Sequence, residues 1–340
     1  MKTMVSLSYD DVLLVPQYSD IRSRKEIDIG TMLGSFRLDL PVISSPMDTV
    51  TEALMASRMG LAGGLGVIHR YCSIDKQAKL IRQQKHGTKA AAIGVTGDFH
   101  DRARSVVAMG AEILCIDVAH GHHSLMEAAI KQLKDTFGDT VHIMAGNVAT
   151  LEGFNALAEW GANSIRCNIG GGSICSTRIQ TGHGVPGLQT IMDCAKTGMD
   201  AAIIADGGIR NSGDAVKALA AGADAVMLGS MLAGTRESCG TEVVHIDGVA
   251  HKTYRGMASE EAQQDWRGSA SSLEGVSATI PMKGSVDDVL GELDNGIRSG
   301  LSYSGARTLA ELQARAKFTR QTAAGISESG THILGLSNVR

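Results

Sequence analysis

The residues best placed for chemistry lie in one glycine-rich segment, 168–178, which reads Asn-Ile-Gly-Gly-Gly-Ser-Ile-Cys-Ser-Thr-Arg. Three successive glycines let the backbone turn sharply and approach a ligand closely, because no Cβ stands in the way. The apolar, β-branched run before them predicts a buried strand, so Cys175 is expected on a loop that follows it. A thiolate is the strongest side-chain nucleophile near neutral pH. The segment therefore predicts covalent catalysis by Cys175, and the alternative is a small buried hydrophobic residue.

Eight short apolar runs along the chain each predict a strand. They span residues 41–46, 64–68, 90–95, 113–118, 142–145, 164–169, 201–205 and 225–228. Amphipathic segments such as 124–137 and 212–221 lie between them, which is typical of βαβ units. Eight such units in roughly 200 residues favour a closed α/β barrel of the (β/α)8 type, with a doubly wound open sheet as the alternative. Residues 1–340 are expected to form a single domain.

Polar residues and glycines follow the predicted strands. They include Met47-Asp48-Thr49, His69-Arg70, Asp117 to Gly121, Gly146-Asn147, Gly170 to Thr177, Asp206-Gly207-Gly208 and Gly229-Ser230. In a (β/α)8 barrel the loops after the strands converge on one face, and this face holds the active site. Each residue alone could be a turn former or a helix cap. Seven such loops at one mouth instead predict a binding site.

The loops after the last two predicted strands indicate an anion site. Glycines at 207, 208 and 229 allow close approach, and each loop is expected to open the next helical segment. Backbone N–H groups there favour phosphate, which barrels often bind after strands seven and eight. The carboxylate of Asp206 would repel a phosphate, so it is expected to accept hydrogen bonds from sugar hydroxyls. The two loops together predict a nucleotide substrate.

The composition excludes several classes of protein. The chain is 43% hydrophobic and 20% charged with a net charge of −4, so no basic face for nucleic acid is expected. Its apolar runs are strand-sized and no signal peptide is recognised, which predicts no membrane partner and a cytoplasmic location. The six cysteines lack paired metal-ligand spacing. We expect reduced thiols, without disulfides or zinc.

Five segments together resemble the IMP dehydrogenase and GMP reductase family. They are Ser-Ser-Pro-Met-Asp-Thr-Val at 44–50, Gly-Gly-Gly-Ser-Ile-Cys-Ser-Thr-Arg at 170–178, Asp-Gly-Gly-Ile at 206–209, Met-Leu-Gly-Ser at 227–230 and Tyr-Arg-Gly-Met at 254–257. The resemblance implies a (β/α)8 barrel, usually a homotetramer, that binds GMP or IMP and a nicotinamide cofactor. It also implies that Cys175 attacks purine C2 and that Thr177 and Glu274 form a proton relay.

The same resemblance assigns binding residues. Those expected to contact the nucleotide are Ser45, Met47, Ser173, Asp206, Gly207, Gly208, Gly229, Ser230, Tyr254, Gly256, Met257 and Gly275. Those expected near the nicotinamide cofactor are Asp117, Ala119, Gly121 and Asn147. A potassium ion is implied at the carbonyl groups of Gly170, Gly172 and Cys175, with Glu328, Ser329 and Gly330 lent by a neighbouring subunit. These last three lie in a C-terminal tail, residues 320–340.

The two reactions of the family share the cysteine nucleophile. They differ in the second half-reaction, which resolves the covalent adduct. Dehydrogenases oxidise IMP to XMP with NAD and hydrolyse the adduct with water activated by an Arg-Tyr pair on a mobile flap. Reductases convert GMP to IMP and ammonia with NADPH. Here the expected flap, approximately 251–284, is short and has Gly268 after Arg267, where a tyrosine would stand. No regulatory CBS modules interrupt the barrel, which is usual for reductases.

Other segments favour the dehydrogenase branch, among them 44–53, 63–70, 206–212, 298–306 and the tail. The flap bears on the step that separates the two reactions, so we predict a GMP reductase that uses NADPH. The alternative is an IMP dehydrogenase that uses NAD. A third reading is a non-catalytic nucleotide-binding relative, because a fold alone does not imply a function. The set of Cys175, Thr177, Asp206 and Glu274 argues against this third reading.

Overall fold

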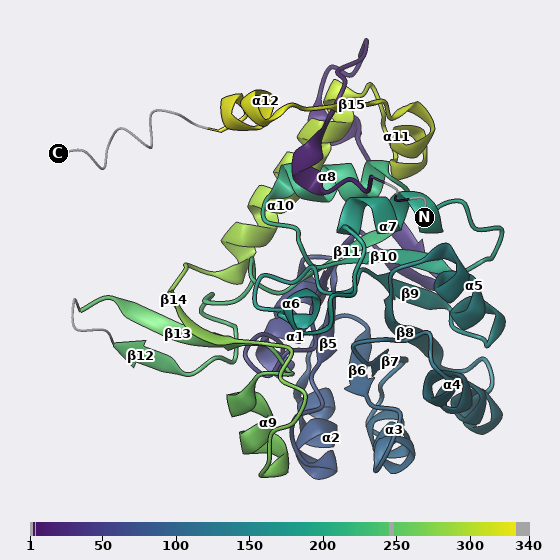
Figure 1. The fold of residues 1–340 in the computed structure, drawn as a ribbon, viewed down its shortest axis with the longest axis vertical. Helices are drawn as coiled ribbons and strands as arrows, with labels where there is room; N and C mark the ends of the chain where they lie inside the picture. Colours follow the sequence, from purple (N-terminus) through teal and green to yellow (C-terminus); the bar gives the residue numbers. More distant parts are fainter. Residues whose placement is uncertain (1–2, 4, 245–247, 331–340) are drawn as a thin grey trace.

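The predicted eight-stranded barrel is confirmed by a computed structural model that describes residues 3, 5–244 and 248–330 (Figure 1). Its strands are β4 (Val42–Ser44), β5 (Leu65–Ile68), β6 (Lys89–Ile93), β7 (Ile113–Asp117), β8 (His142–Val148), β9 (Ser164–Cys167), β10 (Ala202–Asp206) and β11 (Ala225–Leu228). Each strand pairs in parallel with the next, and β11 pairs with β4 to close the barrel. The open-sheet alternative is therefore excluded.

Helices between and after the strands form the outer layer of the barrel. They are α1 (Ala53–Leu61), α2 (Ile74–Gln83), α3 (Phe99–Ala108), α4 (Ser124–Phe137), α5 (Leu151–Glu159), α7 (Gly187–Cys194), α8 (Ser212–Ala220), α10 (Val286–Tyr303) and α11 (Leu309–Arg315). The short helix α6 (Thr177–Thr181) lies instead inside this ring of helices (Figure 1). Polar caps start many of them, as where the Thr150 side chain accepts a hydrogen bond from the backbone N–H of Gly153. Helix α4 has the predicted bounds, and α8 ends one residue before the predicted end. None of the described helices is long and apolar enough to cross a membrane.

The strands are buried on both faces, and alternate residues point into the barrel. Leu65 and Val67 of β5, for example, pack in the interior cluster, whereas Ile68 packs against the helices. Because both faces are buried, these strands appear in the sequence as continuous apolar runs rather than as alternating apolar and polar residues. Aliphatic and small residues fill the interior, which is a packed core rather than a pore.

A hairpin of β2 (Thr31–Leu33) and β3 (Phe36–Leu38) contributes Leu33 and Leu38 to the interior core cluster. Beside it lies His142, the first residue of β8, whose ring meets Phe36 edge-on at 5.8 Å between centroids. Its Nε2 lies 2.8 Å from Ser164 Oγ. Burial, followed by the charge of Lys134, lowers the pKa of His142 to about 4. The buried imidazole is therefore neutral at pH 7.

We expect the protein to lose stability between about pH 6.5 and pH 4 because of His142. The pKa in the folded state is lower than in the unfolded chain, so the contribution is complete above pH ~6.5 and is lost as pH falls to ~4. The loss should approach about 3 kcal/mol of unfolding free energy. Urea unfolding of the wild type and of His142→Gln across this range measures it. Equal pH dependence in both proteins would exclude this origin.

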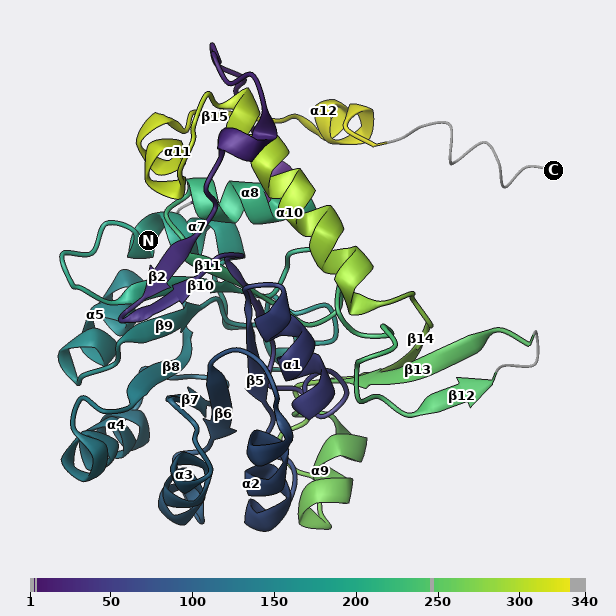
Figure 2. The same cartoon turned by 180° about the vertical axis from the view of Figure 1, so that it is seen from behind.

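An insertion follows β11 and projects from the barrel (Figure 1). It contains β12 (Glu242–Val244), β13 (Ala250–Arg255), α9 (Glu260–Arg267) and β14 (Ser277–Pro281), and its strands form an antiparallel sheet. The expected flap, 251–284, covers most of it, but the extra strand β12 begins earlier. Helix α9 lies beside α2 in both views (Figures 1 and 2).

The two ends of the described chain meet beside the barrel. Strand β1 (Val12–Leu14) pairs with β15 (Phe318–Arg320), after the short 3-10 helix η1 (Tyr9–Asp11) and before η2 (Arg24–Glu26). The last helix, α12 (Ala323–Glu328), extends away from the barrel (Figure 2). Residues 331–340 of the expected tail lie outside the described residues.

Candidate active site

A cavity of about 470 Å³ lies at the carboxyl ends of the strands, and the cysteine loop and the insertion contribute to its wall. Nearly all the residues predicted for the site line it. They are Ser45, Met47, Asp117, Ala119, Asn147, Gly170, Gly172, Ser173, Cys175, Thr177, Asp206, Gly207, Gly208, Gly229, Ser230, Tyr254, Gly256, Met257 and Glu274. Gly121 and Gly275 are not part of the wall, but each contacts a residue that is. The backbone N–H of Gly121 donates to Asn147 O, and Gly275 forms a β-bridge with Cys175. Sequence positions up to 229 residues apart thus meet at one mouth.

The cysteine loop is held in shape at its base by Asn168 and Arg178. Asn168 has φ 125°, and its Nδ2 donates to the carbonyl oxygens of Asp206 and Gly207 at 2.9 and 3.3 Å. The Arg178 guanidinium donates to Ile169 O, Asn168 Oδ1 and Val185 O. Gly170 has φ 76°, and an added Cβ would lie 2.5 Å from Arg178 Cγ, so this turn requires glycine. The result is a rigid loop that presents Cys175 to the cavity.

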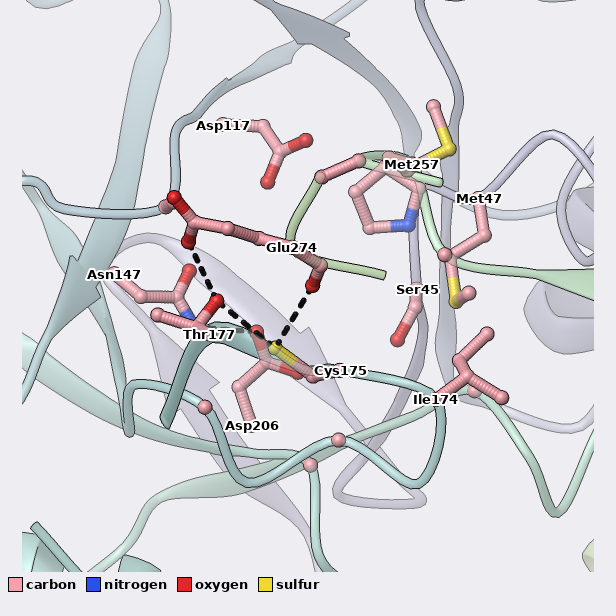
Figure 3. Close-up of a pocket in the computed structure, with 18 of the residues that line it drawn as sticks. Ser45, Met47, Asp117, Asn147, Ile174, Cys175, Thr177, Asp206, Met257 and Glu274 are labelled. Atoms are coloured by element: carbon pink, nitrogen blue, oxygen red, sulfur yellow. Dashed lines mark hydrogen bonds between the residues drawn. The ribbon is translucent and has the colours of Figure 1, made fainter. Parts of the chain in front are cut away.

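Cys175, Thr177 and Glu274 form a continuous hydrogen-bonded chain (Figure 3). The Cys175 thiol donates to Thr177 Oγ1 at 3.2 Å, and that hydroxyl donates to Glu274 Oε2 at 2.7 Å. Cys175 is half-buried, whereas Cys72, Cys115, Cys167 and Cys194 are buried. All six cysteines are free thiols. The chain can pass a proton between a group bound at Cys175 and the Glu274 carboxylate.

Backbone hydrogen bonds set the position of Glu274 relative to Cys175. The residues after α9 return along the cysteine loop as a short antiparallel pair, in which Cys175 is bridged to Gly275. Ser176 N–H donates to Glu274 O at 2.9 Å, and Val276 N–H donates to Ile174 O at 3.0 Å. Gly275 is needed because an added Cβ would meet backbone atoms of Ala258 and Ser259 at 3.1–3.3 Å. The insertion therefore supplies one member of the relay and the barrel supplies the others.

We expect Glu274→Gln to lower kcat by about a hundredfold, because the amide can neither accept nor deliver the relayed proton. The amide keeps the size of the side chain, so nucleotide affinity should change little. Steady-state kinetics together with nucleotide titration measure both quantities. Glu261→Gln, a replacement at an exposed carboxylate on α9, is the matched control. An unchanged kcat in the Glu274 variant would exclude the relay.

The expected phosphate loops follow the neighbouring strands β10 and β11, and both line the cavity. Gly207 and Gly208 have φ of 82° and 78°, which favours glycine, and they follow β10 directly. Tyr254 Oη lies 3.3 Å from Ser173 Oγ, and an added Cβ at Gly229 would lie 3.1 Å from Tyr254 Oη. Burial raises the pKa of Tyr254, which keeps its phenol a hydrogen-bond donor. These groups form a neutral donor surface that suits an anion.

One expectation about these loops is wrong. Residues 230–234 after β11 form turns rather than a helix, in which the N–H groups of Leu232 and Ala233 both donate to Gly229 O. After β10, α8 begins only at Ser212, with Asn211 as its cap. The donors for an anion are thus loop N–H groups, and helix ends contribute less than predicted.

Sequence reasoning missed Arg166, which lies at the centre of the charged part of the site. Its Nη1 lies 2.5 Å from Asp117 Oδ1, and its Nη2 lies 2.7 Å from Asp206 Oδ2. Asn147 Nδ2 also donates to Asp206 Oδ2 at 2.8 Å. Burial opposes the charge of Arg166, but the carboxylates of Asp206 and Asp117 outweigh it and raise the pKa. A charged residue inside an apolar strand was the signal that could have revealed it.

The cavity wall contains further residues to which the sequence analysis assigned no individual binding or catalytic role. They are Pro46, Arg70, Tyr71, Val118, Arg166, Asn168, Ile169, Gly171, Ile174, Ile209, Met227, Leu228, Ala258, Gln263, Arg267, Ser271 and Ser272. Arg70 and Arg267 add positive charge on the side of Asp117 and the insertion. The implied potassium ligands are split: Gly170, Gly172 and Cys175 are in the loop, but Glu328, Ser329 and Gly330 are at the end of α12. Helix α12 extends away from the barrel, so the two implied sets of ligands lie apart within one chain (Figure 2).

Comparison with known proteins identifies the family. Residues 6–332 match the family described as "IMP dehydrogenase / GMP reductase domain". The inosine-5'-monophosphate dehydrogenase of Nitrosopumilus maritimus is 34% identical over 98% of this chain and 99% of that protein. The GMP reductase of Leishmania major is 32% identical over 96% of both.

A solved structure agrees with the sequence comparison. The GMP reductase of Trypanosoma brucei, a cysteine-to-alanine variant in complex with guanosine 5'-monophosphate, superimposes with a TM-score of 0.92 at 30% identity. The match covers 97% of this chain and 98% of that one. The family contains NAD(P)-dependent oxidoreductases of purine metabolism that act on GMP or IMP. This chain therefore belongs to the IMP dehydrogenase/GMP reductase family.

Proposed function

We propose that this protein is a GMP reductase, which converts GMP to IMP and ammonia with NADPH. The observation that carries the proposal is the end of α9. Gly268 follows Arg267 as the left-handed cap of the helix, with φ 69°. A side chain is strained in that conformation. The second residue of a water-activating Arg-Tyr pair therefore has no place after Arg267.

In this proposal the Cys175 thiolate forms a bond to purine C2, and the exocyclic C2–N bond then breaks. Glu274 delivers a proton through the Thr177 hydroxyl to the departing amine, which leaves as ammonia. A bound nicotinamide cofactor would supply a hydride to C2, and the C2–S bond would then break to release IMP and regenerate the Cys175 thiolate. Because that proton leaves with the ammonia, Glu274 takes up a new proton from solvent before the next turnover. Water must stay out of the cavity between these steps.

The binding roles follow the positions in the cavity. Asp206 is proposed to accept hydrogen bonds from the ribose, and Gly208, Gly229, Ser230, Ser173 and Tyr254 to hold the phosphate. Asp117, Ala119 and Asn147 line the cavity beyond Cys175 and Thr177, where the nicotinamide would reach C2. The cationic side chains of Arg70 and Arg267 fit the phosphates of a dinucleotide on that side. A potassium site with ligands from α12 of a neighbouring subunit, within a homotetramer, remains part of the proposal.

Chain length does not separate the two reactions. The alignments with the Nitrosopumilus dehydrogenase and the Leishmania reductase extend over 473 and 475 positions, both more than the 340 residues here. Relatives of either name thus carry residues that this chain lacks. The absence of inserted modules gives no support to one reaction over the other, so the proposal depends on the insertion.

Absorbance at 340 nm in two parallel reactions tests the proposal. With GMP and NADPH we expect the absorbance to fall and ammonia to appear in equal amount. With IMP, NAD and potassium we expect no change. An increase in the second reaction with formation of XMP would overturn the proposal and make the protein a dehydrogenase, in which Arg267 or the Thr177–Glu274 pair activates water.

A further inference from the structure

Helix α9 is attached to the barrel by a stack of two aromatic rings that lies between two cationic side chains. The rings of Tyr71 and Trp266 are stacked, with centroids 5.8 Å apart and an interplanar angle of 19°. Arg70 Cζ lies 5.3 Å from the centre of the Tyr71 ring, and Arg102 Cζ lies 5.5 Å from that of Trp266. We call these four residues the aromatic ladder. Trp266 is its single member from the insertion, and the others belong to the barrel and its helices.

The barrel side of the ladder is rigid. The Arg102 side chain is 2% exposed, and its guanidinium pairs with Asp98 at 2.7 Å and donates to Gln77 Oε1 at 3.0 Å. At the other end, Arg70 donates to the Asp117 carbonyl oxygen at 3.2 Å. Trp266 therefore rests on groups that are already fixed. Stacking on such groups costs little additional side-chain entropy.

The neighbouring ionic contact of α9 is weaker. Asp265 pairs with Arg255 at 2.6 Å, but its side chain is 67% exposed, and solvent screens such a pair strongly. The side-chain hydrogen bonds of Gln263 and Glu261 on α9 are made within the insertion. Among the described residues, Trp266 thus provides the principal contact between α9 and the helical layer.

The docked helix forms part of the cavity wall. Gln263 and Arg267 are one helical turn apart on α9, and both line the cavity on the side of Arg70 and Asp117. We infer that Trp266 is a positioning residue that keeps α9 docked through the catalytic cycle, so that the insertion acts as a fixed wall of the cofactor side and does not swing into the cavity. This inference rests on the proposed function only in assigning that side to the dinucleotide.

Fluorescence tests the docking without any turnover. The chain has two tryptophans, so a Trp160→Phe background reports on Trp266 alone. We expect acrylamide to quench Trp266 about threefold less efficiently than free indole, in the absence and in the presence of GMP with NADP. Tyr71→Leu in the same background should remove the protection. Quenching as efficient as that of free indole, or protection lost when nucleotides bind, would overturn the inference.

Kinetics test whether the docking of α9 affects dinucleotide binding and the exposure of Cys175. We expect Trp266→Ala to raise KM for the dinucleotide and the iodoacetamide alkylation rate of Cys175 about tenfold each, with Trp266→Phe restoring both. Glu260→Gln, at an exposed position of the same helix, is the matched control. Circular dichroism identifies any variant that fails to fold, and Tyr71→Leu then repeats the test from the barrel side. Unchanged KM and alkylation in both folded variants would contradict a positioning role.

The quenching and alkylation experiments test the docking of α9 independently of the proposed function. Quenching and alkylation require no knowledge of the reaction catalysed, because both are measured on the resting protein. If the 340 nm assay reveals a dehydrogenase while Trp266 stays protected, the proposed function fails and the docking stands. If Trp266 is unprotected while GMP is reduced, the docking fails and the proposed function stands.

Discussion

Replacing Cys175 with alanine is expected to reduce turnover by about 10⁴-fold or more, because no other group in the cavity can form the covalent bond to C2. Nucleotide affinity should remain within about tenfold, since the proposed phosphate and ribose contacts do not involve the thiol. Absorbance at 340 nm measures the first quantity and calorimetric titration with GMP the second. Wild-type protein mixed with GMP should also show the covalent adduct by mass spectrometry.

Cys194→Ala provides the matched control, because it removes a buried thiol on α7 that is not part of the cavity wall. Any general effect of losing a thiol should appear in it, at a cost of about 1 kcal/mol in stability and none in kcat. If Cys175→Ala retains wild-type turnover, the covalent mechanism is wrong. If it loses nucleotide binding altogether, the loop has been distorted and the loss of turnover is no longer specific to the thiol.

Arg166→Met is expected to destabilise the protein by about 3–5 kcal/mol, the usual cost of removing one partner from a buried ion pair. The side chains of Asp117 and Asp206 are 17% and 11% exposed, so both would be left as poorly solvated charges close together. Urea unfolding at pH 7 should show a lower midpoint with the same slope. Nucleotide and dinucleotide affinity should fall together, because the guanidinium orients both carboxylates.

Arg37→Met is the control for this second prediction. Arg37 also pairs with two carboxylates, Asp28 and Asp39, but its side chain is 52% exposed. We expect a loss below about 1 kcal/mol there. Adding Asp117→Asn and Asp206→Asn to Arg166→Met should recover part of the stability, because no buried charge then lacks a partner. A midpoint equal to that of Arg37→Met would contradict the expected cost of leaving Asp117 and Asp206 without a partner.

The barrel could be predicted because its signal is local. Each strand is buried on both faces, so it appears in the sequence as a short apolar run, and the polar loop after it marks its carboxyl end. The cysteine loop could be predicted for the same reason, since its glycines and Cys175 are adjacent in the chain. The relay partner Glu274 came only from family resemblance, because it lies 97 residues from Thr177.

Contacts between distant segments could not be predicted. The stacking of Trp266 on Tyr71 depends on how the insertion folds back over α2, and no periodicity in either segment indicates it. The sheet of β12, β13 and β14 is exposed on much of its surface, so it lacks the apolar runs by which the barrel strands were found. The turn after Gly229 was mistaken for a helix because glycine followed by apolar residues is common to both.

The antiparallel pair between the cysteine loop and residues 274–276 makes the position of the relay carboxylate independent of the side chains of α9. Main-chain hydrogen bonds at Ile174 and Ser176 hold the relay carboxylate in place, whatever side chains precede it. The segment from 260 to 273, beyond the backbone of Ala258 and Ser259 that packs against Gly275, can therefore gain, lose or exchange residues while the attack on the purine is preserved. A lineage could change how the covalent intermediate is resolved, by reduction or by hydrolysis, through replacement of that one segment.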